Sequence, residues 1–392
     1  MPSCSPLALP LSICLPTNLT AAANLIKLLL LLTMRKLSLS YSSRILAITI
    51  ILLGFGLIMI YSASVAEAAR DFGNKWYFVS LQFRWALLGL FGTLVISRFH
   101  PQFFAKMAPL VMVVGLILLL LVAIPGIGTK VMGARRWLIV PGVKFQPAVL
   151  IKLIEIIYLS LWLQAKKVTL LQFGIFTALV GGLIMLEPDM GTTLVVVALA
   201  ITMYFLAGYP LRHFVLVGGV GIVVGIIFIV TSSYRLDRVK TFFNPTIDPQ
   251  GSSYHIRQVL LALGSGGMTG VGIGRSRQKY EYLPEATTDS IFAVAGEELG
   301  FIGAGLLILA FLYLLSLIFQ LATHTHDSYS KLLVAGVGAW FSLQFILNLA
   351  AMVALTPLTG VPLPLVSYGG SALVTMLAGI GIVLAVARTE KL

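Results

Sequence analysis

The chain has 392 residues, of which 58% are hydrophobic and only 10% are charged, and its mean hydropathy is +0.99. Too little polar surface remains to solvate a globular protein of this size, which excludes an ordinary soluble protein. The formal net charge is +13. In a membrane protein the position of each Lys and Arg matters more than their sum, so nucleic acid is not expected as a partner.

The first 33 residues carry one charge and end in an apolar run just before Met34-Arg35-Lys36. This run is too short to span a bilayer reliably, and its basic residues follow it, whereas those of a signal peptide come first. Both cysteines lie here (Cys4 and Cys14), so neither a disulfide framework nor a metal cluster is expected. We interpret residues 1–33 as a non-native or disordered extension, and N-terminal sequencing of the native protein tests this.

Ten apolar runs follow, and each predicts a transmembrane helix, since a bilayer core needs roughly 20 apolar residues per helix. Residues 34–392 are therefore expected to form a single all-α, polytopic membrane domain. Two hydrophilic segments, 125–146 and 232–297, break the pattern of short loops and are where chemistry is expected. The predicted helices cover residues 44–64, 77–97, 103–124, 147–164, 168–186, 190–208, 211–231, 298–322, 331–353 and 370–388.

Basic residues in the short loops predict the orientation, because Lys and Arg are retained on the cytoplasmic side. They place both termini in the cytoplasm and both hydrophilic segments outside, with the larger one between helices 7 and 8. The basic residues on the cytoplasmic side are Arg35, Lys36, Arg44, Arg98, Lys106, Lys166, Lys167, Arg212, Lys331, Arg388 and Lys391.

The segment 125–146 breaks this charge rule, since it carries four cations and no acidic residue. Uncompensated cations on the outer side indicate a polyanion ligand, most simply a pyrophosphate at the membrane surface. Contact with anionic lipid headgroups is the alternative. The four cations are Lys130, Arg135, Arg136 and Lys144.

The segment 232–297 is rich in Gly, Pro, Tyr and charged residues, and its low-complexity content is too small for disorder. A loop of this length is expected to fold over a site. Its glycines between Gly264 and Gly274 do not indicate a nucleotide-binding loop, because no Lys-Ser/Thr ending follows and no strand precedes them. Flexible backbone near a membrane-embedded ligand is the preferred interpretation.

Several motifs occur in order from about residue 40 to the C-terminus, and together they resemble the FtsW/RodA/SpoVE (SEDS) family. The matching stretches are Gly133-Ala134-Arg135-Arg136-Trp137 with Gln146-Pro147 and Lys152, then Glu187 to Thr192, Tyr282 to Gly300, and Pro362 to Ser371.

The chain departs from the family's usual residues at three positions: Val149 replaces Glu, Glu187 replaces Gln, and Thr287 replaces His. The change at Val149 leaves Lys152 without its expected acidic neighbour. Glu155 lies three residues further on and is expected to be able to face Lys152 across a helical turn.

The resemblance implies a peptidoglycan glycosyltransferase that polymerises lipid II at the outer face of the bacterial cytoplasmic membrane during cell division or elongation. The stretch Gly272 to Lys279 looks slightly more like the FtsW branch. The implied partners are lipid II, a membrane-anchored class B penicillin-binding protein, and other division or elongation proteins. No cofactor is certain, and a divalent cation is left open.

In this chemistry an acceptor hydroxyl attacks the donor sugar and expels a lipid pyrophosphate, so the site needs a base and several cations. Asp289 matches the family's essential aspartate and is predicted to be the base, with a helix-capping role as the alternative. Glu297 is predicted to orient Arg or Lys groups, unless it only stabilises the helix end. The predicted substrate-binding residues are Arg135, Arg136, Trp137, Lys152, Arg235, Arg238, Glu297 and Ser367.

Two competing functions stay open at this point. A lipid II flippase or transporter also suits a polytopic chain with an intramembrane cation such as Lys152. A non-catalytic division scaffold is the other. Polar residues at mid-membrane depth on several helices would favour transport, whereas most charges of this chain cluster toward the predicted outer face.

Overall fold

The computed structural model describes residues 40–391 apart from 132–133, 141–142, 232–235, 237–239, 241, 243–251 and 280–282. The predicted extension 1–33 lies outside these residues, as do Arg235 and Arg238. Residues from Tyr41 onward form one compact unit.

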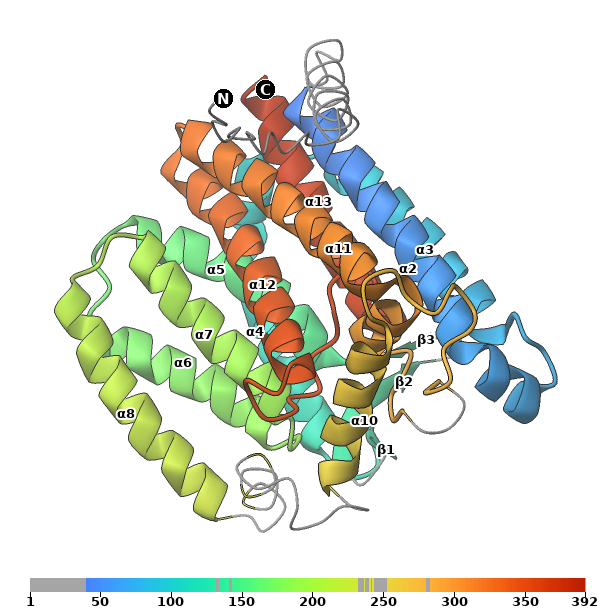
Figure 1. Cartoon of the computed structure of the whole chain (residues 1–392). Helices are drawn as coiled ribbons and strands as arrows, with labels where there is room; N and C mark the ends of the chain where they lie inside the picture. Colours follow the sequence, from blue (N-terminus) through green and yellow to red (C-terminus); the bar gives the residue numbers. More distant parts are fainter. Residues whose placement is uncertain are drawn as a thin grey trace, which may run out of the picture. The chain divides into compact units, whose positions relative to one another are not determined.

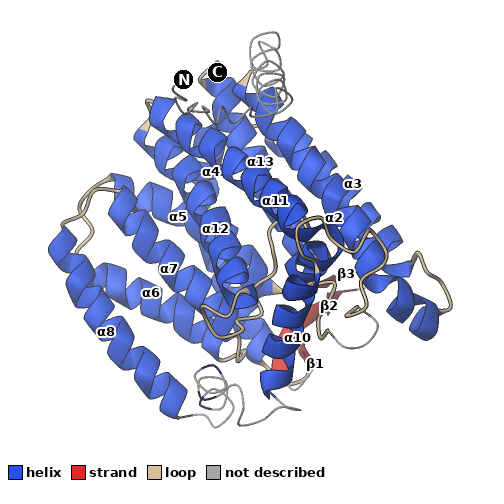
Figure 2. Ribbon diagram, viewed as in Figure 1, coloured by secondary structure: helices blue, strands red, loops and turns tan. Residues whose placement is uncertain are grey.

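Helices make up most of the described chain (Figures 1 and 2). Each of the ten predicted ranges overlaps one of them. The helices are α2 (Tyr41–Phe72), α3 (Tyr77–Ile96), α4 (Pro101–Ala123), α5 (Pro147–Gln164), α6 (Leu170–Met185), α7 (Met190–Leu206), α8 (Leu211–Val230), α10 (Ser252–Ser265), α11 (Ile291–His324), α12 (Ser328–Met352) and α13 (Gly370–Thr389).

Seven helices within the described residues are long and apolar enough to cross a membrane: α2, α3, α4, α5, α11, α12 and α13. The helices α6, α7 and α8 are apolar but have shorter qualifying stretches. Large apolar side chains are exposed on the outer helices, for example Val215 at 79% and Phe301 at 70%. Such exposure is what a lipid-facing surface requires, because lipid solvates apolar side chains as well as a protein core does.

Local sequence explains where several of these helices begin. Pro147 occupies the first turn of α5, where its missing N–H costs nothing. Thr169 and Gln172 form a reciprocal capping box at the start of α6. Asp189 and Asp327 cap α7 and α12 by accepting backbone N–H groups that would otherwise lack partners.

The segment 125–146 folds as a small antiparallel sheet, so the prediction of an all-α protein is wrong here. The sheet consists of β1 (Gly128–Val131), β2 (Ala134–Val140) and β3 (Val143–Phe145) in the order β1-β2-β3. Its strands contain several β-branched and aromatic residues, among them Trp137, Ile139, Val140, Val143 and Phe145, which favour strand over helix. The strands are too short for this signal to stand out in a chain dominated by apolar helices.

The segment 232–297 also contains regular structure. Helix α10 packs against α11 and α12. Helix α11 begins at Ile291, earlier than the predicted residue 298, and Gly300 interrupts it with non-helical angles of φ 67° and ψ −169°. In Figure 1 the sheet and α10 lie at one end of the helix bundle, and the C-terminal end of α13 lies at the other.

Candidate functional site

Asp289 lies immediately before α11 and is partly buried. Ser290 occupies the capping position of α11. The alternative role of Asp289 as a helix cap is therefore wrong. The carboxylate atom Oδ2 faces Gly360, where an added Cβ would lie 3.4 Å from it. A methyl group at position 360 would therefore be in van der Waals contact with the predicted base.

The backbone around Asp289 is held by three successive carbonyl groups. Thr287 O accepts a hydrogen bond from Tyr368 N at 2.9 Å. Thr288 O accepts one from Ser367 Oγ at 2.6 Å, and Asp289 O accepts one from Asn348 Nδ2 at 2.9 Å. This backbone is fixed by α12 and by the segment that precedes α13.

Ser367 was predicted to bind substrate, and the structure gives its buried hydroxyl two protein partners. Besides donating to Thr288 O, the hydroxyl accepts the backbone N–H of Leu363 at 2.9 Å. Gln82 of α3 donates to Ser367 O at 3.3 Å and accepts the N–H of Gly369 at 3.1 Å. In this geometry Ser367 supports the backbone that carries Asp289.

His255 of α10 lies on the opposite side of this turn. Its Nε2 is 2.7 Å from Ser290 Oγ, and the same hydroxyl donates to Pro284 O at 3.1 Å. The turn before α11 is thus contacted by α10 as well as by α12 and the segment before α13.

The predicted cation Arg136 lies at an irregularity of β2. Arg136 is an extra residue in β2, because Thr129 pairs with Trp137 while the next residue, Lys130, pairs with Arg135. Such a bulge redirects the side chain at that position. The Arg136 guanidinium donates to Glu187 O at 3.1 Å and also to Pro188 O.

Trp137 and Lys144 form a second group on the same sheet. The Lys144 ammonium lies 4.9 Å from the centroid of the Trp137 ring, in cation–π range. The carbonyl of Lys144 accepts a hydrogen bond from Ser371 Oγ at 3.4 Å, which ties β3 to the start of α13. The sheet is therefore attached to the motif that supports Asp289.

Lys152 of α5 is only 3% exposed. Asp189 is the carboxylate that interacts with it electrostatically. Asp189 also accepts Gln146 Nε2 at 3.0 Å and Thr192 N at 3.0 Å. The structure thus gathers Gln146, Lys152 and Asp189 at one end of α5 and α7.

Glu155 does not pair with Lys152, so that expectation is wrong. Glu155 is fully buried, and within the described part of the chain neither of its carboxylate oxygens has a hydrogen-bond partner. Val149, at the departure from the family pattern, is 8% exposed and packs as an ordinary apolar side chain.

Glu187, between α6 and α7, is likewise fully buried with no hydrogen-bond partner for either carboxylate oxygen among the described residues. Burial, together with the nearby negative charge of Asp189, raises the pKa of Glu187 to about 8, although Arg136 acts in the opposite direction. At neutral pH this carboxyl is mostly protonated.

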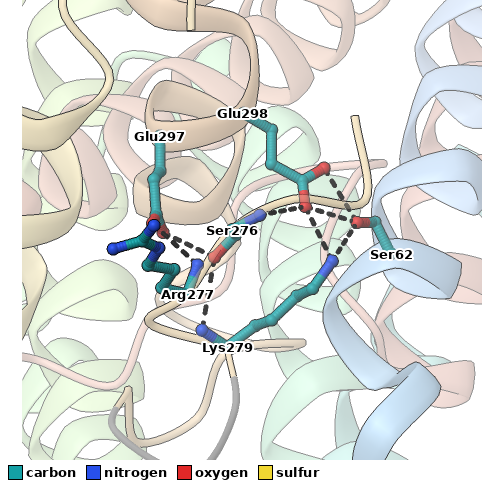
Figure 3. A network of polar contacts seen from close by, with 6 residues as sticks. All are labelled: Ser62, Ser276, Arg277, Lys279, Glu297 and Glu298. Carbon is teal, nitrogen blue, oxygen red and sulfur yellow. Dashed lines mark hydrogen bonds and ion pairs between the residues drawn. The ribbon is translucent and has the colours of Figure 1, made fainter. Parts of the chain in front are cut away.

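Glu297 and Glu298 anchor a network that joins α11 to the preceding loop and to α2 (Figure 3). Glu297 accepts Ser276 Oγ and the backbone N–H of Arg277, the latter at 2.9 Å. It is the neighbouring Glu298 that holds a cation, because it forms a buried ion pair with Lys279 at 2.9 Å.

Two glycines before this network, Gly266 and Gly270, pack closely against backbone. A Cβ on Gly266 would lie 2.1 Å from Gly296 O, and one on Gly270 would lie 2.1 Å from Glu298 O. The interpretation of these two glycines as flexible backbone near a ligand is therefore wrong. They let the loop approach the backbone of α11.

Sequence reasoning missed Ser62, Gln82, Lys279 and Asn348. Lys279 had a usable signal, since two adjacent carboxylates entering an apolar helix require a counterion nearby. No group of three or more His, Cys, Asp or Glu side chains suited to a metal ion occurs in the described ranges. The divalent cation stays a prediction.

The chain is similar to known proteins over most of its length. The family model for FtsW, RodA and SpoVE, described as "Cell cycle protein", matches residues 43–392. A probable peptidoglycan glycosyltransferase FtsW from Trichlorobacter lovleyi is 39% identical over 359 residues, which cover 90% of this chain and 94% of that protein. Stage V sporulation protein E from Bacillus subtilis is 37% identical over 353 residues, covering 88% and 96%.

Two solved structures share the fold. One comes from a study of polymerization and crosslinking by a peptidoglycan synthase complex; it has a TM-score of 0.72 and 27% identity, and the match covers 88% of this chain and 97% of that one. The rod shape determining protein RodA from Thermus thermophilus has a TM-score of 0.65 and 27% identity, with 89% and 97% coverage.

Proposed function

Because the chain belongs to the FtsW/RodA/SpoVE family, we infer that it is a peptidoglycan glycosyltransferase and a multi-pass membrane protein. We propose that its substrate is lipid II and that it acts at the outer face of the bacterial cytoplasmic membrane. The observation that carries the mechanism concerns the partly buried Asp289. Its carboxylate faces Gly360, and three hydrogen bonds hold the backbone around it.

In the proposed reaction Asp289 is the base. The acceptor sugar hydroxyl gives its proton to the Asp289 carboxylate as its oxygen bonds to the donor's anomeric carbon. The bond from that carbon to the pyrophosphate oxygen breaks, and the electron pair leaves with the lipid pyrophosphate. A base fixed in one position lowers the barrier because little reorganisation is needed at the moment of transfer.

The leaving pyrophosphate needs positive charge. We propose that Arg135 and Lys144 supply it, since both are cations of the sheet with at least partly exposed side chains, and Trp137 lies beside Lys144. Lys152 supports them from α5. Arg136 shapes the site by holding the chain at Glu187 and Pro188, and Arg235 and Arg238 are proposed as further phosphate contacts.

We propose that ten helices span the membrane, that both termini are cytoplasmic, and that Asp289 and the sheet face outward. The placement of basic residues supports this orientation. A transpeptidase partner, most simply a class B penicillin-binding protein, is proposed because one structural neighbour comes from a peptidoglycan synthase complex. A division role is proposed because several relatives are named FtsW. A fluorescent fusion that labels the lateral wall without a midcell ring would contradict it.

The central test is Asp289→Asn, which keeps the size of the side chain but removes its basicity. Purified protein should lose polymerisation of labelled lipid II by about 10²- to 10⁴-fold while still binding it. The matched control is Asp327→Asn, which removes a carboxylate that caps α12 through Ser330 and should leave the rate unchanged. Normal polymerisation by folded Asp289→Asn protein would overturn the mechanism.

Transport of lipid II is the second candidate, since α5 carries Lys152 and Glu155 buried inside an apolar helix. Liposomes with fluorescent lipid II separate the two functions. Glycan polymer supports the enzyme, whereas movement between leaflets without polymer supports transport. If folded protein supplied with its transpeptidase shows neither activity, that result would favour a non-catalytic scaffold.

A further inference from the structure

Asp289 is carried by a short helical segment that the structure separates from the spanning part of α11. The segment runs from Ile291 to Leu299 and ends where Gly300 adopts non-helical angles. Nine helical residues extend about 14 Å. Because the helix is interrupted, the spanning part beyond Gly300 does not by itself set the position of this segment. Contacts made by the segment must do so.

A buried ion pair holds the end of the segment farthest from Asp289 (Figure 3). Glu298 Oε1 and Lys279 Nζ are 2.9 Å apart, and both side chains are 0% exposed. Ser62 Oγ of α2 lies 2.6 and 2.8 Å from the two carboxylate oxygens and accepts a hydrogen bond from Lys279 Nζ at 3.1 Å. Ser276 N approaches the same carboxylate at 3.4 Å.

The three side chains belong to three different parts of the chain. Ser62 lies on α2, Lys279 on the loop before α11, and Glu298 on the segment itself. A buried ion pair often adds little net stability compared with apolar residues of similar volume, because desolvation offsets the attraction. A buried ion pair nevertheless requires one defined arrangement of its side chains, because every donor and acceptor must find a partner away from water.

We propose that Ser62, Lys279 and Glu298 act as a positioning lock that sets Asp289 for catalysis. The proposal rests on the proposed function, with Asp289 as the base. The lock fixes one end of the segment against α2, while Asn348 and His255 contact the other end through Asp289 O and Ser290 Oγ. The side-chain contacts of the lock join its residues to one another and to Ser276, so the lock acts on Asp289 through the segment. Movement of α2 would therefore alter the catalytic geometry through Ser62.

The first test compares two serines on the same helix. Ser62→Ala removes the hydroxyl that bridges the ion pair, whereas Ser64→Ala removes a fully buried hydroxyl whose Oγ has no hydrogen-bond partner within the described residues. For Ser62→Ala we expect kcat for lipid II polymerisation, per folded molecule, to fall about 10- to 100-fold with KM unchanged, as for a displaced catalytic group. Ser64→Ala should keep the wild-type kcat.

The second test removes the charges together. Lys279→Met with Glu298→Leu replaces the pair by apolar side chains and should fold, because no unpaired buried charge remains. We expect a similar loss of kcat and faster hydrogen exchange in residues 283–299. Adding Ser62→Ala to this variant should cause little further loss, because residues that act through one network are not additive.

Three results would overturn the lock: wild-type kcat in Ser62→Ala, equal losses in Ser62→Ala and Ser64→Ala, or additive losses when Ser62→Ala is combined with the charge-free pair. Asp289→Asn in the same assay separates this proposal from the proposed function. If Asp289→Asn is inactive while Ser62→Ala is normal, only the lock is wrong. If Asp289→Asn is active, the assignment of the base is wrong.

Discussion

Buried carboxyl groups in this chain differ sharply in their partners. Glu298 is fully buried and receives an ammonium, a hydroxyl and a backbone N–H. Glu187 is equally buried, and among the described residues neither of its carboxylate oxygens has a hydrogen-bond partner. A carboxylate without donors is strongly disfavoured away from water, so a group of this kind holds its proton instead.

Glu187 should make stability depend on pH. Its pKa rises from 4.5 in the unfolded chain to about 8 in the folded protein. The folded state therefore binds the proton more tightly, and stability falls as pH rises from 4.5 to about 8, by up to about 1.4 kcal/mol per pH unit. In Glu187→Gln this contribution is absent. Thermal unfolding in detergent should show a smaller drop between pH 5.5 and 8.5 than in the wild type.

The exposed Glu285 supplies the control for this measurement. Glu285→Gln should keep the wild-type dependence of the unfolding temperature on pH. If Glu187→Gln follows the wild-type curve as well, the carboxyl of Glu187 is charged in the folded protein and the interpretation of its environment is wrong.

At the level of secondary structure, interruptions of a helix and of a strand shape the site as much as the helices do. The interruption at Gly300 and the bulge at Arg136 both redirect the chain near the proposed active site. Gly300 occupies a region of backbone angles that is essentially restricted to glycine. A Cβ there would also lie 2.3 Å from Gly270 N. Two independent constraints thus require glycine at this position.

Gly300→Ala should destabilise the protein by about 3 kcal/mol or more, from backbone strain plus the clash with the loop. The displaced segment should also lower the polymerisation rate. Gly305→Ala is the matched control. Gly305 lies in the same helix, and a Cβ there would meet no atom within 4 Å. That change should be neutral or stabilising by up to about 1 kcal/mol, through helix propensity. Equal unfolding temperatures for the two variants would contradict the role given to Gly300.

Across the whole molecule, the elements proposed to carry the chemistry gather at one end of the helix bundle. The sheet is tied to the start of α13 through Lys144 and Ser371, and α10 packs against α11 and α12. The short loops that carry Lys and Arg are formed by other parts of the sequence than the sheet and α10. A single orientation in the membrane would then place the whole site outside, where the growing glycan is expected.

Single-cysteine labelling tests this orientation, with both native cysteines replaced by serine. A membrane-impermeant maleimide applied to intact cells should label Lys75→Cys and Ile127→Cys. It should reach Lys167→Cys, Arg212→Cys and Lys391→Cys only after lysis. Protection at both Lys167 and Arg212 is expected because α6 and α7, if both cross, return the chain to the cytoplasmic side. Labelling of either variant in intact cells would contradict the ten-helix topology.

The sequence by itself determined the membrane class and the places of ten helices, because runs of apolar residues are local and a bilayer demands a fixed length of them. Asp289 was identified through the run from Tyr282 to Gly300 that resembles the family signature, and its role as the base stays a prediction. The small sheet was missed, since its strands are short and their signal is weak beside the helices.

Only the tertiary structure decided which side chains meet. Ser62 and Glu298 are 236 residues apart in the chain, and no periodicity in the sequence predicts their contact. The same is true of Arg136 with the carbonyls of Glu187 and Pro188, and of Asn348 with Asp289. Such contacts depend on how the helices pack and where the chain is interrupted, and many distant residues determine that packing together.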